Sequence, residues 1–247
     1  EAAAAAPVAA PSPPPVDPAQ IAAGHAQALA SATSREERAR ALAELIALSR
    51  ASNGAATQHI ADFEKNYDAM KQTLAKSAWW TSGNGAPPPQ AARWMEDAEL
   101  LAAQGDRPAM LDMAFALGQG RSARKDRAAA VETYLRAMAI SAGADAFSQR
   151  IRLSASRGLT IVLNAIVEHK DAEAAARVRP ALQANADLGA AGMKYYLGLF
   201  NECVHRPADL NAAREWYRKA AADPAWRAIA ERKTELLGKW CPRPVRA

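Results

Sequence analysis

"DLNAAREWYRKAA", residues 209–221, decides the fold of this 247-residue protein. Asp209 suits the N-cap of a helix, because its carboxylate can accept hydrogen bonds from the first-turn amides. The alanines at the fourth and fifth places are small enough to let a neighbouring helix approach closely. Trp216 and Tyr217 lie side by side and offer large apolar surfaces for packing. The stretch therefore predicts a packed structural helix and not a catalytic site.

Two further segments align with this stretch without gaps: "DRAAAVETYLRA" from Asp126 and "DAEAAARVRPAL" from Asp171. Each begins with Asp and has alanines at the fourth and fifth places, and the ninth place holds Tyr134, Arg179 or Tyr217. The spacing between successive starts suits one pair of helices per repeat with variable loops. A Leu-Gly pair precedes the first and last repeats, near the end of an amphipathic helix. Each repeat is thus predicted as helix A, a loop, a capping Asp and helix B.

This pattern resembles the Sel1-like repeat family, a relative of the tetratricopeptide repeat. The last repeat matches the family through Leu197, Gly198, Asp209, Ala213, Trp216, Tyr217, Lys219, Ala220 and Ala221. The first repeat matches through Leu117, Gly118, Gly120, Asp126, Ala130, Tyr134 and Ala137, but has Thr133 where the family has Trp. The resemblance spans about residues 106–237 and implies an all-α fold, a right-handed α-solenoid of antiparallel helix pairs.

The middle repeat departs from the family, and the rest of the sequence has no known motif. Arg179 and Pro180 stand near the aromatic position, so we expect helix B of this repeat to end or kink there. Upstream of the repeats, Ser34 and Glu37 form a predicted capping box, and apolar residues recur at helical spacing over 60–74. Within the repeat region, the apolar run 159–167 is expected to lie in a helix. The expected regions are an Ala/Pro-rich disordered linker (1–18), an N-terminal helical region (19–105), the repeats (106–241) and a tail (242–247).

The two cysteines and the linker at 1–18 favour an exported protein. A disulfide between Cys203 and Cys241 would anchor the C-terminus; two free buried thiols are the alternative, and a zinc site with His205 would have only three ligands. The linker is rich in proline, which is typical of a tether left by signal-peptide removal or joined to a lipid anchor. We expect a periplasmic or exported location, with a lipoprotein as one option. No segment is apolar for long enough to span a membrane.

Six residues are candidates for binding a partner. The formal charge of +5 weakly favours a partner with an acidic surface, and the loop 120–127 is basic but lacks the aromatics typical of RNA-binding modules, so no nucleic acid is expected. Adjacent helical residues point about 100° apart, so one tryptophan of the 79–80 pair is expected in the core and the other at a contact with a partner. The alternative is that both pack beneath the following loop. For the basic loop 120–127, the alternative is that it is simply solvated. The candidates are Trp79, Trp80, Trp94, Arg121, Arg124 and Lys125.

The sequence contains no recognisable catalytic, cofactor or metal constellation. The histidines lack ligand spacing, and the carboxylates at 96–99 fit a solvated helix face. We expect a non-enzymatic protein-binding module of the bacterial periplasm or cell envelope, acting as an adaptor or inhibitor; the resemblance implies roles such as an immunity protein for a secreted toxin or a secretion and envelope assembly factor. The alternative is a glycan- or peptidoglycan-binding accessory domain in which exposed tryptophans stack on sugars. Further binding residues are expected in the irregular loops and the degenerate middle repeat.

Overall fold

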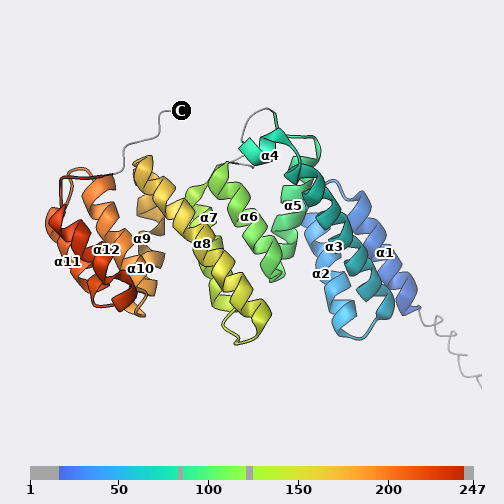
Figure 1. Ribbon diagram of the computed structural model, residues 1–247. Helices are drawn as coiled ribbons and strands as arrows, with labels where there is room; N and C mark the ends of the chain where they lie inside the picture. Colours follow the sequence, from blue (N-terminus) through green and yellow to red (C-terminus); the bar gives the residue numbers. More distant parts are fainter. Residues whose placement is uncertain (1–16, 83–85, 121–124, 242–247) are drawn as a thin grey trace, which may run out of the picture. The chain divides into compact units, whose positions relative to one another are not determined.

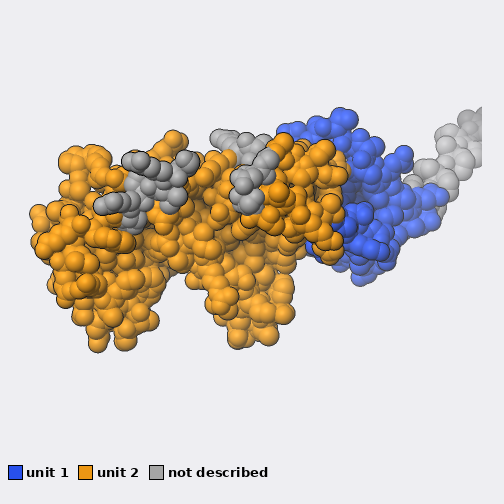
Figure 2. Space-filling model, turned by 45° about the horizontal axis from the view of Figure 1, so that its top comes forward, with its two compact units in different colours: residues 1–69 blue, residues 70–247 orange. Residues whose placement is uncertain are grey.

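The computed structural model describes residues 17–82, 86–120 and 125–241, and within these ranges all regular structure is helical. The protein divides into two compact units, residues 1–69 and 70–247 (Figure 2), and the division falls inside one helix. The expected region boundaries at 18, 105 and 241 stay predictions. The tail and nearly all of the Ala/Pro-rich linker lie outside the described residues.

Unit 1 contains α1 (Pro18–Ser31), α2 (Arg35–Arg50) and most of α3 (Gly54–Ala75). The predicted capping box at the start of α2 is confirmed: the Glu37 amide donates to Ser34 Oγ at 3.2 Å, and the Ser34 amide donates to the Glu37 carboxylate at 3.4 Å. The Asn53 side chain donates to the Pro18 carbonyl at 2.9 Å, which ties the start of α1 to the turn before α3. Leu42 and Leu45 of α2 are fully buried.

Unit 2 contains the remaining helices, and those that follow one another along the sequence pack as antiparallel pairs (Figure 1). After the end of α3, its helices are α4 (Ala78–Ser82), α5 (Gln90–Ala103), α6 (Arg107–Gln119), α7 (Arg127–Ile140), α8 (Ala146–Glu168), α9 (Ala172–Asp187), α10 (Ala191–Leu199), the π-helical turn η1 (Phe200–Val204), α11 (Leu210–Ala221) and α12 (Pro224–Glu235). The all-α prediction is confirmed. The apolar run 159–167 lies inside α8 as expected, with most of its branched side chains buried.

The three aligned aspartates are helix N-caps, as the sequence predicts. Asp126, Asp171 and Asp209 each accept a hydrogen bond from the amide three residues later, at 2.9, 3.1 and 2.9 Å. Arginines join two of these caps: Arg127 pairs with Asp171 at 2.8 Å, and Arg177 pairs with Asp126 at 3.1 Å. The beginnings of α7 and α9 are therefore linked by two ion pairs as well as by apolar packing.

Of the two outcomes expected at Pro180, the end of the helix is wrong, because α9 continues to Asp187. The kink stays a prediction. Proline removes one helical hydrogen bond, to the carbonyl of Ala176, and its ring crowds the preceding turn. Ala176 and Pro180 both lie on the less buried side of α9, where water can bond to the unpaired carbonyl. Val178 and Leu182, on the opposite side, are fully buried and hold the helix against its neighbours.

Both ninth-place tyrosines lie directly against glycines of neighbouring helices. The ring of Tyr217 on α11 packs on Gly198 of α10, where an added Cβ would be 2.5 Å from the ring. Tyr134 on α7 packs in the same way on Gly158 of α8. Burial raises the pKa of Tyr134 to about 12, with a further contribution from the Asp112 carboxylate, so the ring stays neutral. Glycine at these points allows a ring to approach the helix backbone closely.

Replacing Gly158 with alanine is expected to lower the free energy of unfolding by about 1–3 kcal/mol, because the new methyl group overlaps the Tyr134 ring. The matched control is Gly24→Ala in the middle of α1, where no atom lies within 4 Å. That change should be neutral or stabilise by up to about 1 kcal/mol through helix propensity. Urea unfolding followed by circular dichroism measures both; equal effects of the two substitutions would show that the close ring contact is unimportant.

Candidate functional site

A groove of about 810 Å³ lies in unit 2, where the middle repeat meets the last. Its walls come from α9, from η1, from the loop that follows η1 and from the first turn of α11. The lining residues are Arg179, Asn201, His205, Arg206, Pro207, Ala208, Asp209, Leu210 and Asn211. Volumes of about 300–1,000 Å³ are typical of ligand pockets. The groove is therefore large enough to receive a side chain together with its flanking backbone.

Arg179 forms one wall of the groove, at the place that the first and last repeats fill with tyrosine. Its Nη2 donates to the Asn201 side-chain oxygen at 3.0 Å. Asn201 is buried and held in place, since its amide group donates to the Leu197 carbonyl at 3.0 Å and its own carbonyl accepts from the Asp209 amide at 3.0 Å. Burial lowers the pKa of Arg179, and the Asp209 carboxylate partly offsets this. The guanidinium is thus positioned by a neutral partner and stays charged.

The charges around the groove do not cancel. Asp209 uses one carboxylate oxygen to cap α11, and Arg206 donates to the backbone carbonyl of His205 at 3.0 Å. Within the described ranges, no carboxylate forms an ion pair with Arg179 or Arg206. Two guanidinium groups therefore face one carboxylate, and the two arginines and Asp209 of the lining sum to a net charge of about +1.

Behind the groove, η1 places a carboxylate in the core. Glu202 pairs with Lys233 of α12 at 2.8 Å, and both side chains are almost completely buried. The Tyr217 hydroxyl donates to the same oxygen at 2.6 Å, and the Gly238 amide donates to the other at 3.0 Å. Desolvation raises the pKa of Tyr217, and the hydrogen bond to Glu202 raises it further. This network joins η1, α11 and α12 next to the groove residue Asn201.

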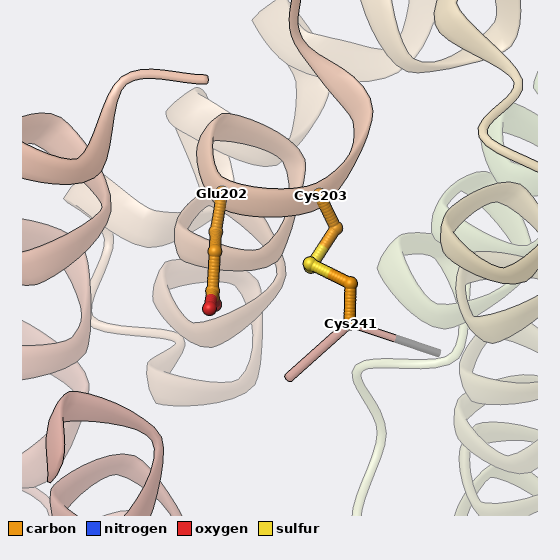
Figure 3. A group of neighbouring side chains, drawn as sticks. All are labelled: Glu202, Cys203 and Cys241. Carbon is orange, nitrogen blue, oxygen red and sulfur yellow. A yellow bond between two sulfur atoms is a disulfide. The ribbon is translucent and has the colours of Figure 1, made fainter. Parts of the chain in front are cut away.

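The predicted disulfide between Cys203 and Cys241 is confirmed, with Cα atoms 5.6 Å apart. Figure 3 shows that the side chains of Glu202 and Cys203 extend from the same turn of η1. Cys241, the last of the described residues, is bonded to the Cys203 sulfur. The Glu202 carboxylate lies near both sulfurs. The sulfurs are bonded to each other and are not thiolates, while Glu202 is already occupied by Lys233, so this cluster is structural in the disulfide state.

The tryptophans that the sequence singled out form an aromatic cluster in unit 2. Trp94 is fully buried and Trp79 is 7% exposed, while Trp80 is half-buried. The Trp80 ring meets Trp94 edge-on at 5.1 Å and Phe115 at 5.2 Å. Packing thus accounts for Trp79 and Trp94, and only Trp80 keeps appreciable exposed surface.

Most of the candidate cations of the basic loop cannot be placed beside these rings. Arg121 and Arg124 lie outside the described residues, and Lys125 is exposed. That any of the six candidate residues binds a partner stays a prediction. The groove residues were anticipated only as a region, the degenerate middle repeat and the irregular loops. The signal that could have named Arg179 was its place in the repeat alignment, where a charged side chain replaces a packing ring.

Comparison of the sequence with protein-family models, with curated proteins and with solved structures finds no match. Among the described helices, none is long and apolar enough to cross a membrane. The chemistry of the groove therefore has to be argued from its own residues. Cations that have no carboxylate partner, beside fixed amides and a small apolar surface, can bind an anionic group and orient it.

Proposed function

We propose that the protein is a non-enzymatic protein-binding module of the bacterial periplasm or cell envelope, built as an α-solenoid of Sel1-like repeats. The observation that carries the proposal is the groove at Arg179. At this place a cation stands where the other repeats have a packing ring, and a cavity lies between the repeats with Arg179 held in its wall by Asn201. Stacked helical repeats commonly present such surfaces to proteins or peptides. The shared Asp caps of the three repeats support the solenoid part of the proposal.

The location and role follow from the same features. The disulfide favours an oxidising compartment, since cytosolic thiols are kept reduced. A binding surface without catalytic machinery suits an adaptor or an inhibitor; we propose these two roles, with an immunity protein for a secreted toxin or a secretion and envelope assembly factor as the specific forms.

The glycan-binding alternative receives less support. Stacking on a sugar needs an exposed aromatic face, and the burial of Trp79 and Trp94 leaves little of either ring available. The partner proposed here is therefore a protein, and the experiment below includes the alternative as an outcome.

Site-specific photo-crosslinking tests the proposal. A photoreactive amino acid at Ala208, which is exposed and lines the groove, is compared with the same amino acid at Ala228, which is exposed on α12 and does not line it. In the native envelope, we expect one discrete protein adduct from position 208 and none from position 228, identified by mass spectrometry. Retention on peptidoglycan without a protein adduct at position 208 would contradict the proposal and favour the glycan-binding alternative.

A further inference from the structure

We propose that the groove binds a carboxylate of an acidic peptide segment, and that Arg179 is the residue that recognises it. The inference rests on the proposed protein-binding function and specifies the chemistry of the partner. The segment has an aspartate, a glutamate or a free C-terminus that enters the groove, where its carboxylate meets the guanidinium of Arg179.

The hydrogen bonding of Arg179 leaves room for such a ligand. A guanidinium has five N–H donors, and the bond to Asn201 uses one of them. No carboxylate in the described part of the protein pairs with it. The planar fork of arginine matches a carboxylate through two parallel hydrogen bonds, which are charge-assisted and stronger than bonds between neutral groups. Asn201 fixes one edge of the guanidinium and thereby reduces the entropy lost when a ligand binds the other donors.

The remaining groove residues favour a carboxylate over a phosphate. Asp209 lies close enough to act electrostatically on Arg179, so it would also repel an incoming anion. A phosphate group carries nearly twice the charge of a carboxylate at neutral pH. Its attraction to the arginines and its repulsion from Asp209 grow in proportion to that charge, whereas the cost of removing the group from water grows faster. A lining of net charge about +1 is matched by a single negative charge.

The shape of the groove favours a peptide segment over a small free acid. Pro207, Ala208 and Leu210 supply apolar surface beside the cations. Asn211 supplies a side-chain amide that can bond to a backbone. The volume of about 810 Å³ is far more than a lone carboxylate needs. A short extended segment satisfies both parts of the lining, with its carboxylate at Arg179 and its backbone along the loop.

Titration of the intact, disulfide-bonded protein with two capped tripeptides tests the inference. The probes are acetyl-Ala-Glu-Ala-amide and acetyl-Ala-Gln-Ala-amide, which differ only in charge, with inorganic phosphate as a third arm. In ¹H–¹⁵N spectra we expect the Glu peptide to shift the Arg179 Nε–H and the amides of 208–212 in a saturable manner. The Gln peptide should bind at least about tenfold more weakly because its amide carries no charge. Phosphate should also bind at least about tenfold more weakly, because removing it from water costs more and it makes no contact with the apolar part of the lining.

Variants assign the effect to one side chain. Arg179→Gln should weaken the Glu peptide at least about tenfold, and Arg179→Lys should retain an intermediate affinity because it keeps the charge without the fork. Arg214→Gln is the matched control, an exposed arginine on α11 outside the groove, and should leave affinity unchanged. Circular dichroism checks that each variant folds. If a variant does not fold, the comparison of the Glu and Gln peptides on the unaltered protein still tests whether the groove binds a carboxylate.

Three results would overturn the inference: equal binding of the two peptides, tighter binding of phosphate, or unchanged affinity in a folded Arg179→Gln variant. The failure of the broader proposal is distinguishable. A protein adduct at position 208 that persists in Arg179→Gln would keep the protein-binding function and remove the carboxylate. Binding of the Glu peptide without any protein adduct at position 208 would keep the carboxylate recognition and remove the protein-binding function.

Discussion

Replacing Lys233 with methionine is expected to lower the free energy of unfolding of unit 2 by about 3–5 kcal/mol, the cost of leaving one partner of a buried ion pair uncompensated. Lys233 and Glu202 are 2.8 Å apart and are shielded from water. Methionine has a similar length and can fill the volume, so the loss reports mainly on charge. Lys233 also donates to the Trp240 carbonyl at 2.8 Å, which adds one hydrogen bond to the loss.

The control for this prediction is another lysine near the C-terminus. Lys239→Met removes an exposed charge and should change stability by less than about 0.5 kcal/mol. The double variant Glu202→Gln with Lys233→Met removes both charges and should recover part of the loss, since neither charge is then left unpaired. Urea unfolding monitored by circular dichroism gives all three values. A loss below about 1 kcal/mol for Lys233→Met would mean that water reaches the Glu202 carboxylate.

The helices were predictable because their signals are local. Each of the three capping aspartates binds an amide in the first turn of its own helix, and both partners can be read from one short stretch of sequence. The same holds for the capping box at Ser34. The helix does not end at Pro180, one of the two outcomes expected there, because tertiary packing of Val178 and Leu182 outweighs one missing hydrogen bond. Local sequence signals therefore predict where these helices begin, whereas the end of a helix also depends on tertiary packing.

The groove and the charged core were not predictable in the same way. Glu202 and Lys233 are far apart in the sequence and meet only when α10, η1 and α12 pack. Arg179 and Asn201 likewise belong to different repeats. The size of the tryptophans makes them candidates for contacts with a partner, but two of them, Trp79 and Trp94, are buried in the packing of unit 2. A departure from the repeat pattern, the charge at the ninth place, was the more informative feature.

Three consecutive residues of η1 connect the groove to the core and to the disulfide. Asn201 holds Arg179, Glu202 binds Lys233 and Tyr217, and Cys203 joins Cys241. Figure 3 shows Glu202 and Cys203 next to each other on this turn, with Cys241 bonded to Cys203. The side chains of Asn201, Glu202 and Cys203 therefore contact residues on α9, α11, α12 and the C-terminal segment. A disturbance at the disulfide is thus expected to reach the groove through a single turn of backbone.

Removing the disulfide is expected to cost about 4 kcal/mol, because the bond joins residues at a sequence separation of 38 and restricts the unfolded state. The variant Cys203→Ala with Cys241→Ala avoids reactive thiols and should unfold at a correspondingly lower urea concentration. It should still fold, because the Glu202 carboxylate holds the Gly238 amide and Lys233 holds the Trp240 carbonyl, so the C-terminal segment keeps two other attachments.

Reducing agent provides the internal control for this prediction. It should destabilise the unaltered protein to about the level of the double alanine variant and have no effect on the variant itself. A thiol assay on protein purified without reductant should detect almost no reactive thiol under denaturing conditions. Two thiols per molecule would contradict the bond and remove the main support for an oxidising compartment. A stability loss below about 1 kcal/mol with the bond present would instead show that the Glu202 and Lys233 contacts alone anchor the C-terminus, and the groove wall would then be independent of the redox state.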